Sequence, residues 1–302
     1  MDYQSLPKLR DSISYVYIEH AIIEQEDSSI VAIRQDGRIP IPVSAVTCLM
    51  LGPGTSVTHA AIKAAAENGC LIAWCGESAM HYYASGTGET RSAENIILQA
   101  QFCTDPEKRL EVARRMYLRR FGEITDQSYS LKQLRGMEGI RVREAYRVAA
   151  KAAGVFWTGR SYKSKDWDEQ DPINKALSQA NSLLYSVCQA AVISLGFSTA
   201  LGFIHTGKQL SFVYDVADLY KAETAIPAAF LAVKNSRGDL NTAVRCVCRD
   251  LFVKSRILKR IPEDLEWIFQ IKDREQLEAL TIGNIWDPEG EIPGGVNYQG
   301  EE

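Results

Sequence analysis

The sequence has few histidines, no C-x-x-C pair and no long apolar run. Its 302 residues include four histidines and seven scattered cysteines. An odd number of scattered cysteines favours reduced thiols over a disulfide framework and disfavours a structural zinc site, so we expect a cytoplasmic protein. No apolar stretch approaches the ~20 residues that a membrane-spanning helix needs. The opening residues, MDYQSLPKLRDSIS, lack the apolar core of a signal peptide, and we expect no contact with a membrane.

Nucleotide-binding and serine-hydrolase motifs are also missing. The stretch GPGTS, residues 52–56, resembles a phosphate-binding loop only superficially. It lacks the Gly-Lys-Ser/Thr end of a P-loop and the third glycine of a dinucleotide-binding fold. We interpret it as a turn in which Thr55 or Ser56 caps the helix that follows.

Charge is distributed unevenly along the chain, although the net charge is only −4. Residues 1–88 contain 5 Lys and Arg against 9 Asp and Glu. Residues 89–280 contain 29 Lys and Arg against 24 Asp and Glu, and residues 281–302 contain no Lys or Arg against 5 Asp and Glu. A basic middle between acidic ends predicts an anionic partner for the middle of the chain.

The pattern of apolar residues predicts an α+β protein with two domains. Residues 1–88 form a small, β-rich N-terminal domain with one short helix at about 57–68, because short Ile-, Val- and Tyr-rich runs alternate with turns such as Asp-Gly. A linker follows at about 85–93, rich in Gly, Ser and Thr. Residues 94–280 have helical periodicity and are expected to form a larger, all-α domain. The acidic, Pro- and Gly-rich residues 281–302 are expected to be a flexible tail.

The start of the first long helix is expected at a capping box, in which Thr104 caps the helix and Glu107 lies three residues later. Further helices are expected at about 131–154, 171–196, 211–235 and 241–260. The helix at 171–196 is apolar on several faces and is therefore expected to be central.

The first candidate site lies in GFIHTGKQLSFVYDVADLYK, residues 202–221. Asp215 and Asp218 lie three residues apart, on the same face of the expected helix, and Lys221 continues that face. His205 precedes them across a short loop. One imidazole with carboxylates suits Mn²⁺, and carboxylates with water suit Mg²⁺. The alternative is a face of solvated charges beside a core histidine.

The second candidate is Glu138, which lies between Gly136 and Gly139 in a helical pattern. Glycines are unfavourable within helices, so this pair indicates close approach by a backbone or a ligand. The alternative is a helix start at which Glu138 accepts hydrogen bonds from the first turn.

A basic stretch surrounds Glu138: residues 107–151 contain 12 Lys and Arg against 6 Asp and Glu. Arginine at this density favours phosphate contacts, with Arg114 and Arg115 as candidates, or else a solvated helix face. Four aromatic residues are available to stack on unpaired bases: Tyr117, Tyr146, Trp157 and Tyr162.

Three stretches, in this order and spacing, resemble a known family: GMEGIRVREAY, DPINKALSQANSLLY and GFIHTGKQLSFVYDVADLYK. They are similar to the CRISPR-associated integrase family, the first of the universal CRISPR adaptation proteins. LMLGPGTSVTHAAIKAAAENGCLIAWCGE and YASG are similar to its type I-E branch. The resemblance covers about residues 10 to 260.

The resemblance implies an N-terminal β domain, an all-helical catalytic domain and divalent-metal-dependent DNA chemistry. In that chemistry, the 3′-hydroxyl ends of a new spacer attack phosphodiesters of CRISPR repeat DNA, and family members also cleave branched DNA. Carried over by motif, the ligands of Mg²⁺ or Mn²⁺ are Glu138, His205 and Asp218. Asp215 is an acidic neighbour that tunes or shares this catalytic site.

The resemblance also implies DNA contacts and protein partners. The expected ligand is double-stranded DNA with splayed or single-stranded 3′ ends, and the expected assembly is a homodimer bound to the small second CRISPR adaptation protein. Type I-E members have a tyrosine at the position of His20 that stacks where the DNA strands splay, and histidine can also stack. The DNA-contacting residues that the resemblance implies are Lys208, Lys221, Arg245, Arg249, Tyr162, Trp167, Tyr185 and Tyr214.

Two other functions remain open at the level of residues. One is a stand-alone, structure-specific endonuclease for branched DNA, because a single site can direct either a 3′-hydroxyl or water at a phosphodiester. The other is a non-catalytic DNA-binding scaffold whose carboxylates are structural.

Overall fold

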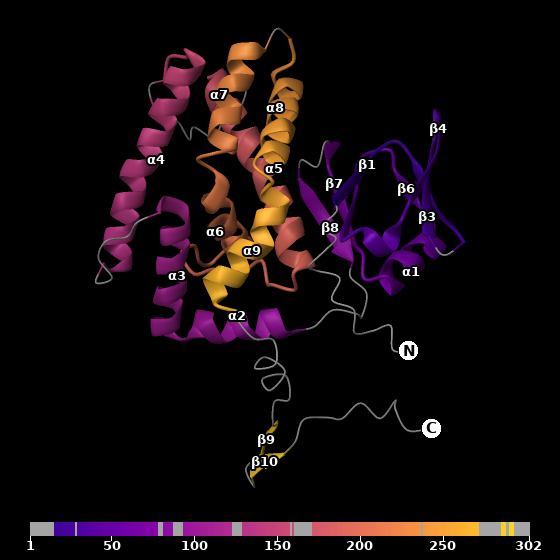
Figure 1. Cartoon of the computed structure of the whole chain (residues 1–302), viewed down its shortest axis with the longest axis horizontal. Coiled ribbons are helices and arrows are strands. Elements are labelled where there is room, and N and C mark those ends of the chain that lie inside the picture. The colour runs from indigo at the N-terminus through magenta and orange to yellow at the C-terminus, as the bar shows by residue number, and fades with distance from the viewer. Residues whose placement is uncertain are drawn as a thin grey trace.

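The computed structural model describes residues 15–27, 29–77, 81–86, 93–122, 129–157, 159, 171–236 and 238–271, and the backbone of 285–287 and 290–292. A strand-rich N-terminal part is followed by a helical part, and Figure 1 shows the two side by side. The expected α+β fold is confirmed. The seven cysteines all lie in the described ranges and are free thiols. Within the same ranges, no helix has both the length and the apolar character to cross a bilayer.

The N-terminal part contains two four-stranded sheets. The first has the order β1 (Tyr15–Ile18), β5 (Cys48–Leu51), β7 (Leu71–Cys75) and β8 (Tyr82–Gly86). Its first three strands are parallel, and β8 pairs antiparallel with β7. The second has the order β4 (Gly37–Ile41), β3 (Ser29–Arg34), β2 (Ile22–Glu26) and β6 (Ser56–Val57). A tight turn joins β3 to β4, as the Asp-Gly step predicts.

Helix α1 (His59–Glu67) and the short 3₁₀ helix η2 (Val43–Ala45) complete this part. The cap of α1 is Thr58, whose side chain accepts a hydrogen bond from the Ala61 N–H at 3.3 Å. The expectation of a cap at Thr55 or Ser56 is therefore wrong. The physical reason is that Ser56 belongs to β6, where strand pairing with β2 extends to Val57 before the helix begins.

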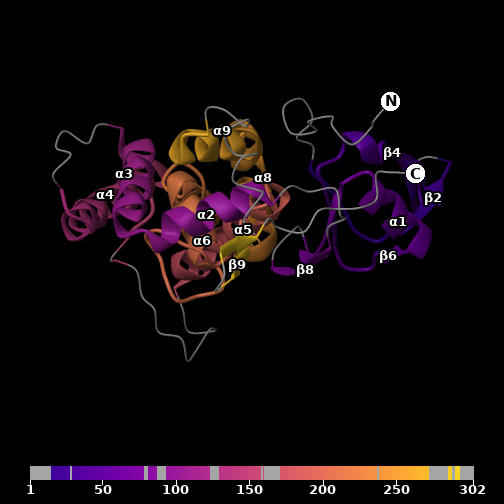
Figure 2. The same cartoon turned by 90° about the horizontal axis from the view of Figure 1, so that it is seen from below.

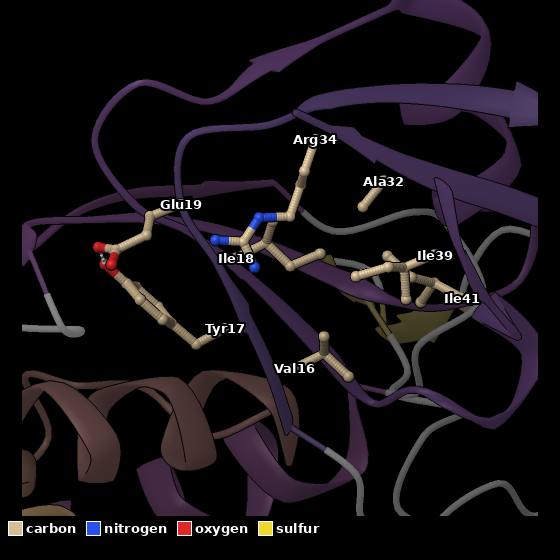
Figure 3. A pocket seen from close by; sticks show the side chains of 8 residues that line it. All are labelled: Val16, Tyr17, Ile18, Glu19, Ala32, Arg34, Ile39 and Ile41. Atoms are coloured by element: carbon tan, nitrogen blue, oxygen red, sulfur yellow. Dashed lines mark hydrogen bonds between the residues drawn. The ribbon is translucent and has the colours of Figure 1, made fainter. Parts of the chain in front are cut away.

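A cavity of about 310 Å³ lies between the two sheets (Figure 3). It is lined by Val16, Tyr17, Ile18, Glu19, Ala32, Arg34, Ile39 and Ile41. The Tyr17 hydroxyl donates a hydrogen bond to Glu19 at 2.7 Å at one edge. Most of the lining is apolar, and none of it belongs to the candidate site residues predicted from the sequence.

The helical part contains α2 (Glu94–Thr104), α3 (Pro106–Phe121), α4 (Leu131–Ala153), α5 (Pro172–Ser194), α6 (Ser211–Tyr220), α7 (Ala225–Asn235), α8 (Leu240–Lys254) and α9 (Ile257–Phe269). Helix α5 is central, as its apolar pattern predicts, and packs against α6, α7, α8 and α9. Helix α6 lies between α3 and α5, while α3 and α4 form the end farthest from the sheets (Figures 1 and 2).

Helix boundaries agree with the sequence in part. Helix α4 ends at Gly154, which has the left-handed conformation of a C-cap, as expected. The capping box expected at Thr104 is wrong. Thr104 is the last residue of α2, and the Asp105 carboxylate caps α3 by accepting from the N–H groups of Glu107 and Lys108.

The two helices expected at 211–235 and 241–260 are each divided in two. The first is interrupted by turns at 221–224, and Pro227 then lies in the first turn of α7, where a missing N–H is tolerated. The second is interrupted at Arg256, whose left-handed φ of 51° ends the run between α8 and α9.

The sheets and helices share an interface built on α5. Cys48, Leu71 and Ala73 pack with Ala190 of α5 in one buried cluster. An ion pair between Arg245 of α8 and Glu77, at 3.0 Å, joins the same two parts. The helices are therefore fixed to β5 and β7 by an apolar contact with a charged pair nearby.

Two segments predicted from the sequence lie largely outside the described residues. Residues 87–92 of the expected linker are outside them. In the expected tail, β9 (Ile285–Asp287) and β10 (Gly290–Ile292) form an antiparallel pair. The rest of 281–302 is outside the description.

A buried carboxylate connects three helices and gives a test of the fold. Asp264 of α9 is 1% exposed, accepts from the Tyr220 hydroxyl at 2.5 Å and pairs with Arg119 of α3. Tyr220→Phe removes one donor from this buried carboxylate, and hydrogen bonds to charged groups contribute about 1.5–3 kcal/mol. We expect that loss in the free energy of unfolding, measured by urea denaturation. Tyr83→Phe, at an exposed tyrosine, is the control; equal stability of both variants would contradict the packing described here.

Candidate histidine–carboxylate site

The site begins with a turn that Asp215 of α6 holds against the helix. The Asp215 carboxylate accepts from the backbone N–H groups of Phe203, Ile204 and His205 at 2.6, 3.1 and 2.8 Å. Gly202 permits this close packing, because a Cβ there would lie 2.2 Å from the His205 carbonyl oxygen. A buried carboxylate needs such donors to offset its loss of water. Asp215 therefore fixes the loop that carries His205.

The same carboxylate orients the imidazole of His205. Nδ1 of His205 lies 2.7 Å from Oδ1 of Asp215, and Nε2 lies 4.0 Å from Oδ2 of Asp218. The hydrogen bond to Asp215 is the main cause of a raised His205 pKa, with burial acting in the opposite direction. A histidine held in this way by a carboxylate presents its other nitrogen in a fixed direction, as metal-binding histidines do.

Glu138 reaches the same place from α4. Its Oε2 accepts from the Tyr117 hydroxyl of α3 at 3.0 Å, and its Oε1 accepts from Arg120 of α3. Of the sequence explanations of its flanking glycines, the helix start and the close approach by a backbone are wrong, whereas the close approach by a ligand stays a prediction. Glu138 lies within α4 rather than at its start, and a Cβ on Gly136 would meet nothing within 4 Å.

Arg120 joins the two acidic parts of the site. Its Nη1 contacts Oε1 of Glu138 and lies 3.7 Å from Oδ2 of Asp218. The Arg120 side chain is 6% exposed, so the guanidinium is an internal cation. Two oxygens therefore lie near Nη1, Glu138 Oε1 and Asp218 Oδ2, and His205 Nε2 lies 4.0 Å from the second of them.

Lys221, Tyr185 and Tyr214 surround the other side of Asp218. Lys221 Nζ donates to Asp218 Oδ1 at 2.5 Å and to the Tyr185 hydroxyl at 3.2 Å. The ring of Tyr214 lies edge-on to Tyr185 and to His205. Burial alone would raise the pKa of Asp218, but Lys221 and Arg120 outweigh it and the pKa is lowered. Asp218 is therefore held as a carboxylate.

The donor set fits a divalent metal ion in its chemistry. One imidazole nitrogen and two carboxylate groups suit Mn²⁺ or Mg²⁺, and Asp215 supplies the supporting hydrogen bond behind the imidazole. Among the described residues, however, no group of three or more His, Cys, Asp or Glu side chains has the arrangement of metal ligands. The physical reason is that Glu138 and Asp218 are drawn to Arg120, which takes the position between them.

The other predicted DNA-contacting residues lie on several surfaces. Lys208 is exposed in the loop that follows His205, and Arg249 is exposed on α8 beside Asp250. Arg245 has a 16% exposed side chain and pairs with Glu77. Arg114 of α3 donates to the Tyr129 carbonyl, and burial lowers the pKa of its neighbour Arg115.

One of the aromatic residues predicted to stack on bases is buried. Tyr117 is 1% exposed, so it is not available for stacking on bases. Tyr146 and Trp157 stack on each other, with ring centroids 5.4 Å apart. Tyr162 and Trp167 lie outside the described residues. His20 is exposed in the turn between β1 and β2, where its backbone N–H donates to the Pro53 carbonyl.

Sequence reasoning did not assign Arg120 and Tyr117 to the site. Their signal was present, since both lie in the basic, aromatic stretch around α3. Arg119 and Arg120 are adjacent and chemically identical, yet Arg119 pairs with Asp264 and Arg120 with Glu138. Only the rotation of α3 against its neighbours decides which arginine enters the site.

Fold and site together define an α+β protein whose helical domain gathers a histidine, three carboxylates and two internal cations. The model of the family "CRISPR associated protein Cas1" matches residues 14–127 and 117–241. A Thermus thermophilus protein named CRISPR-associated endonuclease Cas1 2 is 46% identical, over 99% of this chain and 94% of its own length. The CRISPR-associated endonuclease Cas1 of Escherichia coli K12 is 43% identical, over 93% of this chain and 88% of its own length.

A solved structure described as a TtCas1–DNA complex has a TM-score of 0.78 and 49% identity. The match covers 87% of this chain and 99% of that one. The chain belongs to the Cas1 family of CRISPR-associated proteins. The family predicted from the sequence is therefore confirmed.

The raised pKa of His205 predicts a pH dependence of stability in the metal-free protein. A folded pKa above the reference value of 6.5 means that the charged imidazole stabilises the fold. This stabilisation is fully present below pH 6.5 and is lost as the pH rises through the folded pKa. Asp215→Asn removes the main cause, so the His205 pKa, measured by NMR titration, should fall. Asp36→Asn, at an exposed aspartate, should leave it unchanged; a higher pKa in Asp215→Asn would contradict the assigned contact.

Proposed function

We propose that this protein is a divalent-metal-dependent DNA endonuclease and integrase that inserts new spacers into a CRISPR array. The observation that supports this most strongly is a chain of contacts: Arg120 Nη1 contacts Glu138 Oε1 and lies 3.7 Å from Asp218 Oδ2, which in turn lies 4.0 Å from His205 Nε2. The two oxygens and the imidazole nitrogen come from α4, α6 and the loop before α6. Buried carboxylates are costly, so a cluster of this composition is typical of a site that binds a cation.

Glu138, His205 and Asp218 are the residues that would hold Mg²⁺ or Mn²⁺. When bound, such an ion neutralises a non-bridging phosphate oxygen and polarises the attacking or leaving oxygen of a phosphodiester. Asp215 acts behind this set by fixing the direction of the His205 ring. Lys221 keeps Asp218 ionised and is itself positioned by Tyr185.

Positioning and charge account for most of the rate enhancement that such a site requires. Attack by a DNA 3′-hydroxyl on repeat DNA gives integration, whereas attack by water gives a nick. The same residues serve both outcomes, so a stand-alone endonuclease for branched DNA is the second candidate. A non-catalytic scaffold is the third candidate. The observation that favours it is that Glu138 pairs with Arg120, and Asp218 with Arg120 and Lys221.

DNA is the proposed ligand, in a double-stranded form with splayed or single-stranded 3′ ends. The excess of Lys and Arg in residues 89–280 suits a polyanion, and a solved relative is described as a complex with DNA. Lys208 and Arg249 are exposed and available for phosphate contacts. Lys221, Tyr185 and Tyr214 are proposed to meet DNA only at the site itself.

The proposed assembly is a homodimer that works with the small second CRISPR adaptation protein. This part rests on family membership. Seven free cysteines are consistent with a reducing compartment, and we propose that the protein acts in the cytoplasm.

The activity is tested with the purified protein, its companion, a repeat-bearing plasmid and spacer DNA in the presence of Mn²⁺ or Mg²⁺. We expect covalent joining, detected as labelled spacer in the plasmid. Asp218→Asn should reduce joining by at least about 100-fold, because it removes a ligand charge from the site, while DNA binding is retained. Glu263→Gln, on α9, is a control that should join normally.

Each other outcome supports a different function. Cleavage without joining, with the companion present, favours the stand-alone endonuclease. Tight DNA binding with neither reaction favours the scaffold. Normal joining by Asp218→Asn would rule out this site as the reacting centre.

Salt dependence tests the proposed DNA contacts of α8. Neutralised phosphates release counterions, so the logarithm of affinity should fall linearly with the logarithm of salt concentration. Arg249→Gln should weaken binding and reduce the slope by roughly one phosphate contact. Lys63→Gln, on α1 in the strand-rich part, is the control. An unchanged slope in Arg249→Gln would remove this residue from the binding surface.

A further inference from the structure

Arg120 is positioned as a cation that competes for the site rather than as a permanent part of its framework. Its Nη1 contacts Glu138 Oε1 and faces Asp218 Oδ2. Each carboxylate has its other oxygen fixed elsewhere: Glu138 Oε2 accepts from Tyr117, and Asp218 Oδ1 accepts from Lys221. Both carboxylates therefore keep their positions through contacts that do not involve Arg120.

The Arg120 side chain is held on one side only. Its Nε is buried and has no hydrogen-bond partner. Its guanidinium carbon lies 4.8 Å from the centre of the Phe121 ring, a contact that an arginine keeps or breaks at small cost. A buried donor without a partner is unfavourable. If the guanidinium moves away, the strong ion pair with Glu138 is lost, but the Nε–H can find a hydrogen-bond partner.

A metal ion and Arg120 cannot share the point between the two carboxylates. An ion bonded to both Glu138 Oε1 and Asp218 Oδ2 would lie against Nη1, which contacts the first oxygen and is 3.7 Å from the second. Two cations at such a distance also repel strongly in a partly buried site. Binding of one therefore requires displacement of the other.

We propose that Arg120 is an exchangeable counter-cation, which neutralises Glu138 and Asp218 in the metal-free protein and gives up this position when a divalent metal ion binds. This inference rests on the proposed function, because it assumes that the metal binds at this site. Arg120 lowers the apparent metal affinity and protects the empty cluster from the repulsion of its own carboxylates.

The test is the affinity for Mn²⁺ of the full-length protein without DNA, measured by isothermal titration calorimetry. Arg120→Gln removes the competing charge, so we expect Mn²⁺ to bind about tenfold more tightly than to the original protein. Without metal, the same variant should have a lower melting temperature than the original protein. Added Mn²⁺ should raise the melting temperature of the variant by more than it raises that of the original protein. Arg119→Gln is the matched control, because Arg119 is the adjacent arginine and pairs with Asp264 instead. Its Mn²⁺ affinity should not change.

The outcomes separate the inference from the proposed function. Equal or weaker Mn²⁺ binding by Arg120→Gln, with binding abolished in Asp218→Asn, overturns the role of Arg120 alone. Unchanged binding in Asp218→Asn overturns the metal site itself and, with it, this part of the proposed function.

A second measurement is independent of whether Arg120→Gln folds. The Nε–H resonance of Arg120, assigned with Arg120→Lys, is followed by NMR during a Mg²⁺ titration of the original protein. We expect it to shift with the same dissociation constant as Mg²⁺ binding, because the guanidinium moves. Saturation of the site without a shift of this resonance would overturn the proposal.

Discussion

Neutralisation of carboxylates inside a helical bundle is the constraint on which this site depends. Removing an ionised carboxylate from water costs several kcal/mol unless partners offset it. The cost of burying Asp215 is offset by three backbone N–H groups and the His205 ring. The cost of burying Asp218 is offset by Lys221 and Arg120. Because specific donors fix each carboxylate, Asp215 holds the His205 ring in one orientation and Asp218 keeps Oδ2 directed toward Arg120 and His205.

The fold brings these carboxylates and their partners together from distant parts of the chain. Helix α3 contributes Tyr117 and Arg120, α4 contributes Glu138, and α6 contributes both aspartates. Helix α5 fills the centre and also packs against β7 of the strand-rich domain. The same scaffold therefore supports the site and joins the helices to the sheets. The neighbouring arginines of α3 pair with different carboxylates, Arg119 with Asp264 and Arg120 with Glu138.

The sequence predicts the α+β order and the site histidine and carboxylates better than it predicts their neighbours. Asp215 and Asp218 share a helical face by spacing alone, and the central character of α5 follows from its composition. The division of 211–235 and 241–260 into four helices depends on single turns, one of them at Arg256, which periodicity does not reveal. The basic stretch around α3 indicates that an arginine could enter the site, but the choice of Arg120 over Arg119 follows only from how α3 packs. The glycines beside Glu138 meet no other backbone in the structure, so they do not mark the close backbone approach that their pattern indicates.

The central claim is that Glu138, His205 and Asp218 form one cation site. Anomalous X-ray diffraction from crystals soaked in Mn²⁺ tests it most directly. The account predicts a single strong anomalous peak within bonding distance of Glu138 Oε1, His205 Nε2 and Asp218 Oδ2, with the Arg120 guanidinium moved aside. A peak elsewhere, or an ordered Mn²⁺-soaked crystal with no peak among these three residues, would contradict it.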